Sequence, residues 1–273
     1  MLLTRPFRSG WILALVLPLL AACAAPGVGP DGRPQVRPQS EIGYPEYEPG
    51  AEGSADQPLS ARDAARNFVA VVRVMEPQIE AECRARTVGR NCDFQIGYGM
   101  MGGASPNAAQ SLGPNGEPII EFNLALIAEA RNRDELAFVM GHEAAHHIAG
   151  HLPRQQNQAL TGAMILGALT AATGADDATV REAQNWGATV ASRAYSKEYE
   201  LEADQLGAIL SWNAGFDPER GALFFTRLPD PGDTFLGSHP ANAQRIAVVR
   251  RTVDALKRQA AVSGMPPRPY PVN

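Results

Sequence analysis

Apolar and polar positions divide the chain into flanks that cannot build a core and a central stretch that can. Between residues 24 and 58 proline and glycine recur, and few residues could enter a core. Beyond this segment, apolar residues follow helical spacing over long runs, and short alternating runs occur only between residues 94 and 122. The pattern predicts a mainly helical α+β domain over residues 59–262 and a Pro-rich disordered tail over 263–273.

Local signals predict the first elements of this domain. Ser60 and Asp63 form a capping box for a helix that reaches about Cys83. Alternation predicts one strand over residues 94–98 and another over 119–122, after a Pro-Asn-Gly turn. The second strand is preceded by a proline, which cannot donate to a ladder, so we expect that strand at the edge of a sheet.

An H-E-x-x-H motif carries the clearest chemistry: its histidines are His142 and His146, and its acid is Glu143. Asp134 can cap the surrounding apolar run and Gly150 can end it, so the run predicts a helix. On a helix the two histidines lie one turn apart on one face, and both can reach one Zn²⁺ at about 2.0–2.1 Å. Glu143 lies beside them, where it can accept the proton of a water that attacks a carbonyl.

Two histidines need a third protein ligand, which leaves the fourth position open. The extended motif H-E-x-x-H-x-x-G-x-x-H fails here, because Ala149 and Leu152 occupy the positions of its glycine and its last histidine. His147 and His151 are the nearest other histidines. We interpret them as surface residues or as partners of a ligand rather than as ligands.

An acid-rich segment from Ser196 to about Trp212 predicts a second helix. Glu200 and Asp204 share a face of it one turn apart, so one can bind the metal while the other accepts the N–H of a ligating histidine. The residues alone do not decide which of the two binds the metal. The alternative interpretation is a solvated acidic face.

These motifs resemble the gluzincin metallopeptidases of the HtpX and CAAX-prenyl-protease type, in the periplasmic lipoprotein branch similar to LoiP and BepA. The resemblance covers about residues 60–260: E-x-E-A-D begins 54 residues after the second motif histidine, and Ser-His-Pro follows before the last helix. It implies Glu200 as the third ligand, Asp204 as the support of a ligating histidine, and places for His239 and Arg245 in the catalytic site.

The same resemblance implies a gluzincin fold with a small edge sheet packed beside the zinc-binding helix, where an extended substrate adds as another strand. The residues between the motif histidines, Ala144 and Ala145, and the Gly-rich stretch 101–108 depart from the family pattern, which leaves substrate preference open. His239 could donate to the oxyanion of the reaction or occupy the open metal position as a latch. We favour the latch.

The run Ala159–Ala172 is the most apolar part of the domain and, at about fourteen residues, is too short to span a bilayer. We expect it to form a buried or mobile helix over the active site. Contact with the bilayer or with a client protein is the alternative.

The N-terminus predicts export and lipid anchoring. An apolar run over residues 11–20 has the length of a signal-peptide core, and Leu-Ala-Ala-Cys ending at Cys23 resembles the bacterial lipobox. We expect a signal peptide over 1–22 and a lipidated cysteine with a disordered tether over 23–58. This would hold the enzyme on the periplasmic side of the outer membrane. An ordinary secretory signal is the alternative.

Two cysteines, Cys83 and Cys92, remain once Cys23 carries lipid. In an oxidising compartment we expect them to form a disulfide, with two free buried thiols as the alternative.

A formal net charge of −5 and the lack of a basic stripe argue against nucleic acid as a partner. Two function classes remain. One is a zinc endopeptidase, with one Zn²⁺ per chain, that degrades misfolded or unassembled envelope proteins. The other is a chaperone-like binding or assembly factor for unfolded outer-membrane proteins with little turnover. Glu143 favours the first, because a protein that only binds needs no general base.

Overall fold

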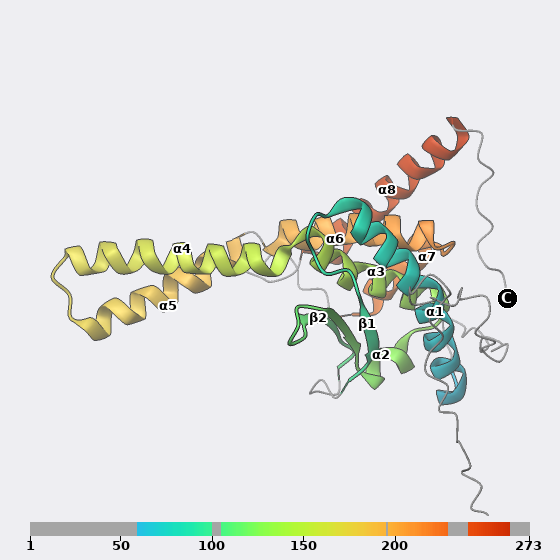
Figure 1. Ribbon diagram of the computed structural model, residues 1–273, viewed down its shortest axis with the longest axis horizontal. Coiled ribbons are helices and arrows are strands. Elements are labelled where there is room, and N and C mark those ends of the chain that lie inside the picture. Colours follow the sequence, from blue (N-terminus) through green and yellow to red (C-terminus); the bar gives the residue numbers. More distant parts are fainter. Residues whose placement is uncertain (1–58, 100–104, 195, 229–239, 263–273) are drawn as a thin grey trace, which may run out of the picture. The chain divides into compact units, whose positions relative to one another are not determined.

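A computed structural model of the protein (Figure 1) describes residues 59–99, 105–194, 196–228 and 240–262. The chain divides into two units, Met1–Glu46 and Tyr47–Asn273, and every described residue belongs to the second. The predictions for Cys23 and His239, for the signal and tether segments and for the tail after 262 lie outside the described residues.

Helices dominate the second unit, and three short strands complete it, which confirms the mainly helical α+β class. In chain order the elements are α1 (Ala61–Arg86), β1 (Gln95–Tyr98), β2 (Ala108–Leu112), β3 (Pro118–Phe122), α2 (Leu124–Glu129), α3 (Arg133–Ala149), α4 (His151–Ala172), α5 (Asp177–Ala194), α6 (Ser196–Asn213), α7 (Pro218–Gly221), the 3-10 helix η2 (Ala222–Arg227) and α8 (Asn242–Val262).

The sheet has the order β1-β3-β2, with β1 parallel and β2 antiparallel to β3. β3 is therefore the central strand, and the prediction that placed it at an edge is wrong. Pro118 opens β3 opposite Leu112, whereas pairing with β1 begins one residue later, at Ile119, so its missing N–H interrupts no ladder on that side. The strand missed by the sequence prediction, β2, is an edge strand.

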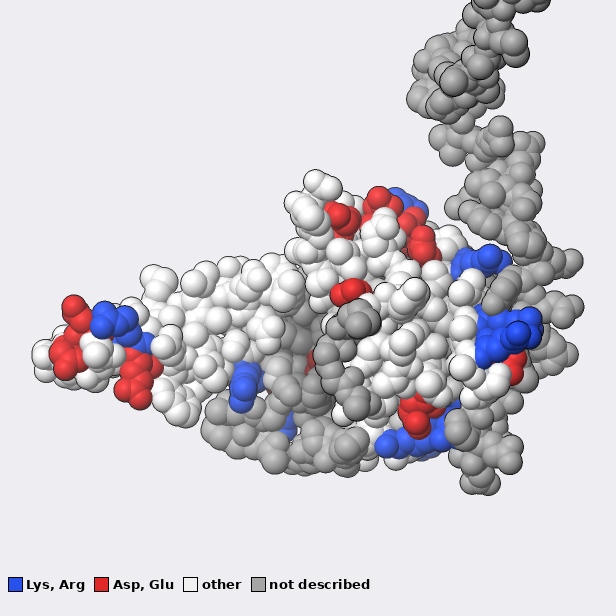
Figure 2. Space-filling view, turned by 90° about the horizontal axis from the view of Figure 1, so that it is seen from below, with Lys and Arg blue, Asp and Glu red and all other residues white. Residues whose placement is uncertain are grey.

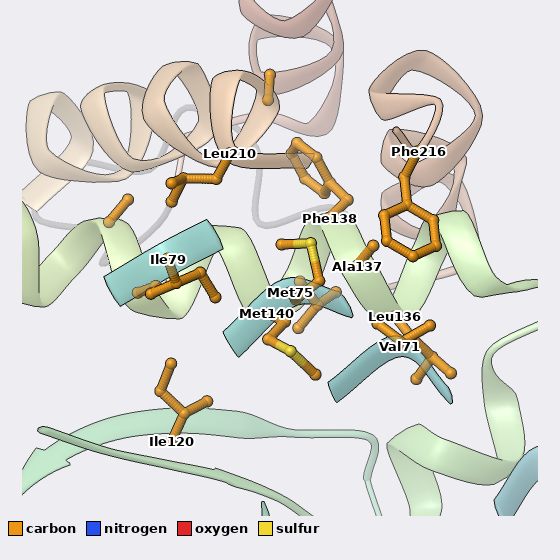
Figure 3. Packing of buried hydrophobic residues seen from close by; sticks show 14 of the residues in the cluster. Val71, Met75, Ile79, Ile120, Leu136, Ala137, Phe138, Met140, Leu210 and Phe216 are labelled. Carbon is orange, nitrogen blue, oxygen red and sulfur yellow. The ribbon is translucent and has the colours of Figure 1, made fainter. Parts of the chain in front are cut away.

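The core forms around α3, which lies between α1 and α6 (Figure 3). One stripe of α1, Val71, Met75 and Ile79, is fully buried at helical spacing. Leu210 of α6 is buried beyond α3, and Ile120 of β3 belongs to the same cluster. The helix that carries the H-E-x-x-H motif is thus held on three sides by packed apolar residues.

The N-cap of helix α3 lies two residues earlier than predicted. Asn132, not Asp134, is the N-cap, because its side chain accepts the backbone N–H of Glu135. Asp134 lies in the first turn and accepts the N–H of Asp217 and a hydrogen bond from Arg220, which ties α7 to α3. The helix ends as predicted at Gly150, which adopts a left-handed φ of 71°.

Helices α3 and α6 approach each other at a pair of glycines. A Cβ on Gly141 would lie 2.8 Å from the carbonyl oxygen of Gly207, and a Cβ on Gly207 would lie 2.8 Å from the backbone nitrogen of His142. Neither space admits a side chain. This contact brings the motif histidines of α3 to the acidic face of α6.

The apolar run 159–172 lies in α4, which pairs with α5 to form a hairpin that extends away from the other helices (Figure 1). The prediction of a buried helix over the active site is wrong. A group of large apolar side chains on the hairpin is exposed: Leu160, Met164, Ile165, Leu166, Leu169, Trp186 and Val190. The two helices pack closely on each other at Gly162 and Gly187, and the apolar side chains on their other faces stay exposed.

None of the helices in the described part of the chain is both long enough and apolar enough to cross a membrane. The hairpin also carries no charged side chain between Arg154 and Asp176. Figure 2 shows the acidic and basic residues gathered at its tip, with an uncharged surface behind them.

A disulfide joins Cys83, near the end of α1, to Cys92. It closes a loop that contacts the end of α3: the carbonyl of Asn91 accepts a hydrogen bond from His147 Nε2 at 2.8 Å, and Arg90 donates to the carbonyl oxygen of His147. His147 is buried, so its interpretation as a surface histidine is wrong.

Candidate metal centre

Three side chains of α3 and α6 converge on one point. His142 Nε2 lies 3.1 Å from His146 Nε2 and 3.4 Å from Glu200 Oε2, and His146 Nε2 lies 3.5 Å from Glu200 Oε1. Among the described residues, the ligand atoms of these three side chains lie close enough together to hold a metal ion.

The spacing of these atoms fits zinc. Ligands bound at about 2.0–2.1 Å in a tetrahedral site lie about 3.3–3.4 Å from one another. The three separations, 3.1, 3.4 and 3.5 Å, bracket that value, and two imidazoles with one carboxylate form a donor set of catalytic zinc sites. His142, His146 and Glu200 would hold the ion and leave its fourth position open.

The other ring nitrogen of His142, Nδ1, contacts a buried carboxylate on the side away from the candidate metal position. It lies 2.9 Å from Asp204 Oδ1, and Asp204 is fully buried. Arg245 of α8 donates two hydrogen bonds to the Asp204 carboxylate, at 2.7 and 2.8 Å. Its guanidinium also lies 3.6 Å from the centre of the Phe225 ring. A chain of buried charges therefore orients the first histidine.

The pKa values of this group follow from burial and from these partners. Burial alone would lower the pKa of His142, but its hydrogen bonds to Asp204 and Glu200 raise it to about 10. Burial, together with the neighbouring His142, lowers the pKa of His146 to about 3. The pKa of Asp204 stays below its usual value despite burial, because His142 and Arg245 donate to its charged form.

Glu143 borders the cluster and is partly buried. Burial raises the pKa of its carboxyl group, and the nearby Glu200 raises it further, against the opposing effect of His142. The backbone of Gln110 on β2 lies close enough to this carboxylate to lower its pKa, against the effect of burial. A carboxylate with a raised pKa is a stronger proton acceptor, which suits a general base.

A pocket of about 280 Å³ opens beside His142 and Glu143. Its wall is mostly apolar, with side chains from α2, α3 and the η2 region: Leu126, Val139, Phe224, Phe225 and Leu228. Arg245 and the start of β2 complete it, and no residue of α4 or α5 is among the described residues that line it. The size and lining of this pocket suit an apolar side chain bound next to Glu143.

The structure thus brings together five of the predicted residues: His142, Glu143, His146, Glu200 and Asp204, with Arg245 behind them. His151 is buried and lies against His146, so it is a partner of a candidate ligand.

Sequence reasoning missed β2 and the aromatic residues of η2. The predicted Pro-Asn-Gly turn could have indicated β2, because a hairpin turn before a strand implies a partner strand on its other side.

Two imidazoles from an H-E-x-x-H helix and a carboxylate from a second helix define the class of protein: a metallopeptidase of the gluzincin type. A family model described as Peptidase family M48 matches residues 99–253, which is more than half of the chain. The chain belongs to peptidase family M48, as the sequence resemblance predicted.

Curated relatives agree with this assignment. The beta-barrel assembly-enhancing protease of Escherichia coli O157:H7 is 29% identical over 154 residues, which covers 50% of this chain and 31% of the relative. The human protein Metalloendopeptidase OMA1, mitochondrial, is 23% identical over 258 residues, which covers 88% of this chain and 46% of the relative. The chain therefore spans less than half the length of either relative.

Proposed function

We propose that the protein is a zinc-dependent endopeptidase of the bacterial cell envelope. The observation that carries this proposal is the convergence of His142, His146 and Glu200 with Glu143 beside an apolar pocket. Bound zinc would supply Lewis-acid polarisation of the peptide carbonyl and would lower the pKa of a water molecule. Glu143 accepts the proton of the attacking water and passes it to the leaving amine.

The open edge of β2 provides the place for a substrate backbone. Asn107 and Gly113 hydrogen-bond toward β3, so with a period of two the backbone groups of Ala108 and Gln110 face the free edge. Gln110 already reaches Glu143 from this edge. An extended peptide that pairs with β2 would pass the catalytic acid and place one side chain in the apolar pocket.

Zinc content and casein hydrolysis test the proposal together. The wild-type protein should contain one zinc per chain and degrade casein, and Glu143→Gln should keep the zinc while losing about 10²–10⁴-fold in rate. Glu198→Gln, which changes an exposed acid two residues before Glu200, is the control and should behave as wild type. Casein cleavage by Glu143→Gln at the wild-type rate would rule out the proposed mechanism.

The cellular setting is part of the proposal. The Leu-Ala-Ala-Cys element supports a lipid anchor on Cys23 and a place on the periplasmic side of the outer membrane. The native protein should incorporate palmitate and fractionate with membranes, and Cys23→Ser should do neither. Unchanged fractionation of that variant would point to another anchor, with the α4–α5 hairpin as the first suspect.

For substrates we propose misfolded or unassembled envelope proteins. The names of the bacterial relatives, beta-barrel assembly-enhancing protease, support unfolded outer-membrane proteins among them. A client-holding function with little turnover is the second candidate, because the hairpin exposes apolar side chains such as Leu160, Met164 and Trp186.

The two functions are separated by comparing the binding of an unfolded β-barrel protein to Glu143→Gln with the fate of the same protein on wild type. Both predict binding, but only the endopeptidase function predicts that wild type cleaves the bound client.

His239 enters the proposal as a latch on the open metal position. His239→Ala should then raise peptidase activity or provoke self-cleavage. A variant that keeps its zinc but loses about 10²–10³ in kcat would assign His239 to the oxyanion instead.

A further inference from the structure

The two candidate histidine ligands are supported in different ways. The Nδ1 of His142 faces Asp204 at 2.9 Å, and Asp204 is held by Arg245. The Nδ1 of His146 faces another imidazole, His151 Nδ1, also at 2.9 Å. The proposed function assigns no part to this second chain of contacts.

His151 is not a fourth metal ligand. Its Nδ1 points at the back of the His146 ring, whereas the converging ligand atoms are the Nε2 atoms of His142 and His146 and the oxygens of Glu200. The other nitrogen of His151, Nε2, faces away toward Glu202 Oε2 at 3.1 Å. Both ring nitrogens are therefore engaged outside the metal cluster.

Only one arrangement of protons satisfies these contacts when a metal is bound. His146 would bind through Nε2 as a neutral imidazole, so its proton is on Nδ1, and Nδ1 donates. His151 Nδ1 must then accept, which places the single proton of His151 on Nε2. That proton is donated to the carboxylate of Glu202. In this arrangement every hydrogen-bond donor among His146, His151 and Glu202 faces an acceptor.

Glu202, the last residue in this series of hydrogen bonds, is also held in place. Arg154 donates to both oxygens of Glu202, at 3.3 and 3.4 Å, and to the carbonyl of Ala149 at 2.7 Å. The ring of His151 stacks on Tyr199, with centroids 4.7 Å apart and planes 15° apart. His151 itself is 3% exposed, so its orientation is set by packing as well as by hydrogen bonds.

The break between α3 and α4 makes the contact possible. On one continuous helix, positions five apart are rotated by about 140° and would face different sides. Gly150 interrupts the helix with a φ of 71°, and α4 begins at His151. The first residue of the new helix therefore turns back onto His146. A side chain at Gly150 would be strained and would meet Arg90 at 2.8 Å.

We propose that His151 is a positioning residue for His146: it accepts the Nδ1–H of this ligand, and Glu202 holds it in the accepting orientation. The inference rests on the proposed zinc site. Hydrogen bonds of this kind fix the ring of a metal ligand and increase its basicity, and their loss costs about 10–100-fold in metal affinity or activity. The role differs from that of a catalytic residue, because His151 would act only through His146.

The test measures the zinc dissociation constant by competition with a chromophoric chelator. His151→Leu removes the acceptor at similar volume and should raise the zinc Kd about 10–100-fold. His151→Asn, whose Oδ1 can take the place of Nδ1, should restore most of the affinity. The visible spectrum of the Co²⁺-substituted protein should shift in His151→Leu and return toward wild type in His151→Asn.

Variants of Glu202 keep the test decisive if His151→Leu does not fold. The Glu202 side chain is 46% exposed, so Glu202→Ala should fold, and it should raise the zinc Kd several-fold. Glu198→Ala, an exposed acid one turn earlier on α6, is the matched control and should leave the Kd unchanged.

A wild-type Kd in folded His151→Leu, or in Glu202→Ala, would overturn the inference. Equal Kd values for the Leu and Asn variants would do the same, since a purely structural role needs no acceptor. These results would leave the proposed function intact. A wild-type protein that binds no zinc would overturn the proposed function and this inference with it.

Discussion

Two pairs of helices, α3 with α6 and α4 with α5, pack through the same kind of contact. They differ in how much of each pair is buried. Each pair closes on facing glycines, Gly141 with Gly207 in the first and Gly162 with Gly187 in the second. Around the first pair, α1, the sheet and α8 bury nearly every side chain of α3 and one face of α6. The second pair packs mainly on itself and leaves its apolar outer faces exposed.

The difference shows what close helix packing can and cannot do. In α3 and α6 it brings imidazoles and carboxylates within 3.5 Å, and the surrounding core prevents them from moving apart. In α4 and α5 the same close packing builds a hairpin that contributes none of the three candidate metal ligands. The apolar residues on its outer faces are exposed, and we propose that they contact client proteins. Three predictions sharpen this comparison.

The largest effect is expected where a buried charge loses its partner. Arg245→Met leaves the fully buried Asp204 without its bidentate cation and should lower the free energy of unfolding by about 3–5 kcal/mol. Arg154→Met, at the exposed base of the hairpin, should cost no more than about 1 kcal/mol. Urea unfolding of the metal-free proteins measures both. Equal losses would mean that the two regions do not differ in burial as described.

A smaller effect is expected from methyl groups added between the helices. Gly207→Ala forces α6 away from α3 and should cost about 1–3 kcal/mol and weaken zinc binding. Gly162→Ala creates a comparable clash in the hairpin but should leave zinc stoichiometry and casein hydrolysis unchanged. Thermal unfolding with metal analysis distinguishes them. Zinc loss in Gly162→Ala would show that the hairpin and the site are one structural unit.

The smallest effect is expected on the exposed apolar surface. Met164 is 72% exposed, so Met164→Gln should change the free energy of unfolding by no more than about 0.5 kcal/mol. The fully buried Met75 provides the contrast, because Met75→Ala should cost about 2–5 kcal/mol. Met164→Gln should still weaken the binding of an unfolded client. A large stability loss in that variant would mean that the hairpin face is covered.

The predictable parts of the molecule are those that depend on residues close in sequence. The capping box at Ser60, the H-E-x-x-H helix and the end at Gly150 follow from spacing within one or two turns. The acidic helix follows in the same way, and the family resemblance identified Glu200 as its ligand. The disulfide partners, Cys83 and Cys92, follow from the count of cysteines once Cys23 is assigned to lipid.

The other parts depend on tertiary contacts that local patterns do not encode. β2 has the sequence Ala-Ala-Gln-Ser-Leu, without β-branched or aromatic residues, and is a strand because β3 pairs with it. The apolar run in α4 indicated burial, but its partner helix covers only one side. His151 reaches His146 only through the left-handed residue Gly150, whereas helical spacing placed it on another face.

The zinc content of purified wild type, His146→Ala and Glu200→Ala tests the central claim most directly. We expect one zinc per chain in the wild type, because the donor atoms of three side chains lie 3.1–3.5 Å apart, which suits one tetrahedral ion. Each variant should lose the stoichiometric metal while keeping its helical content by circular dichroism. Equimolar zinc that survives in a folded His146→Ala or Glu200→Ala protein would contradict the proposed ligand set.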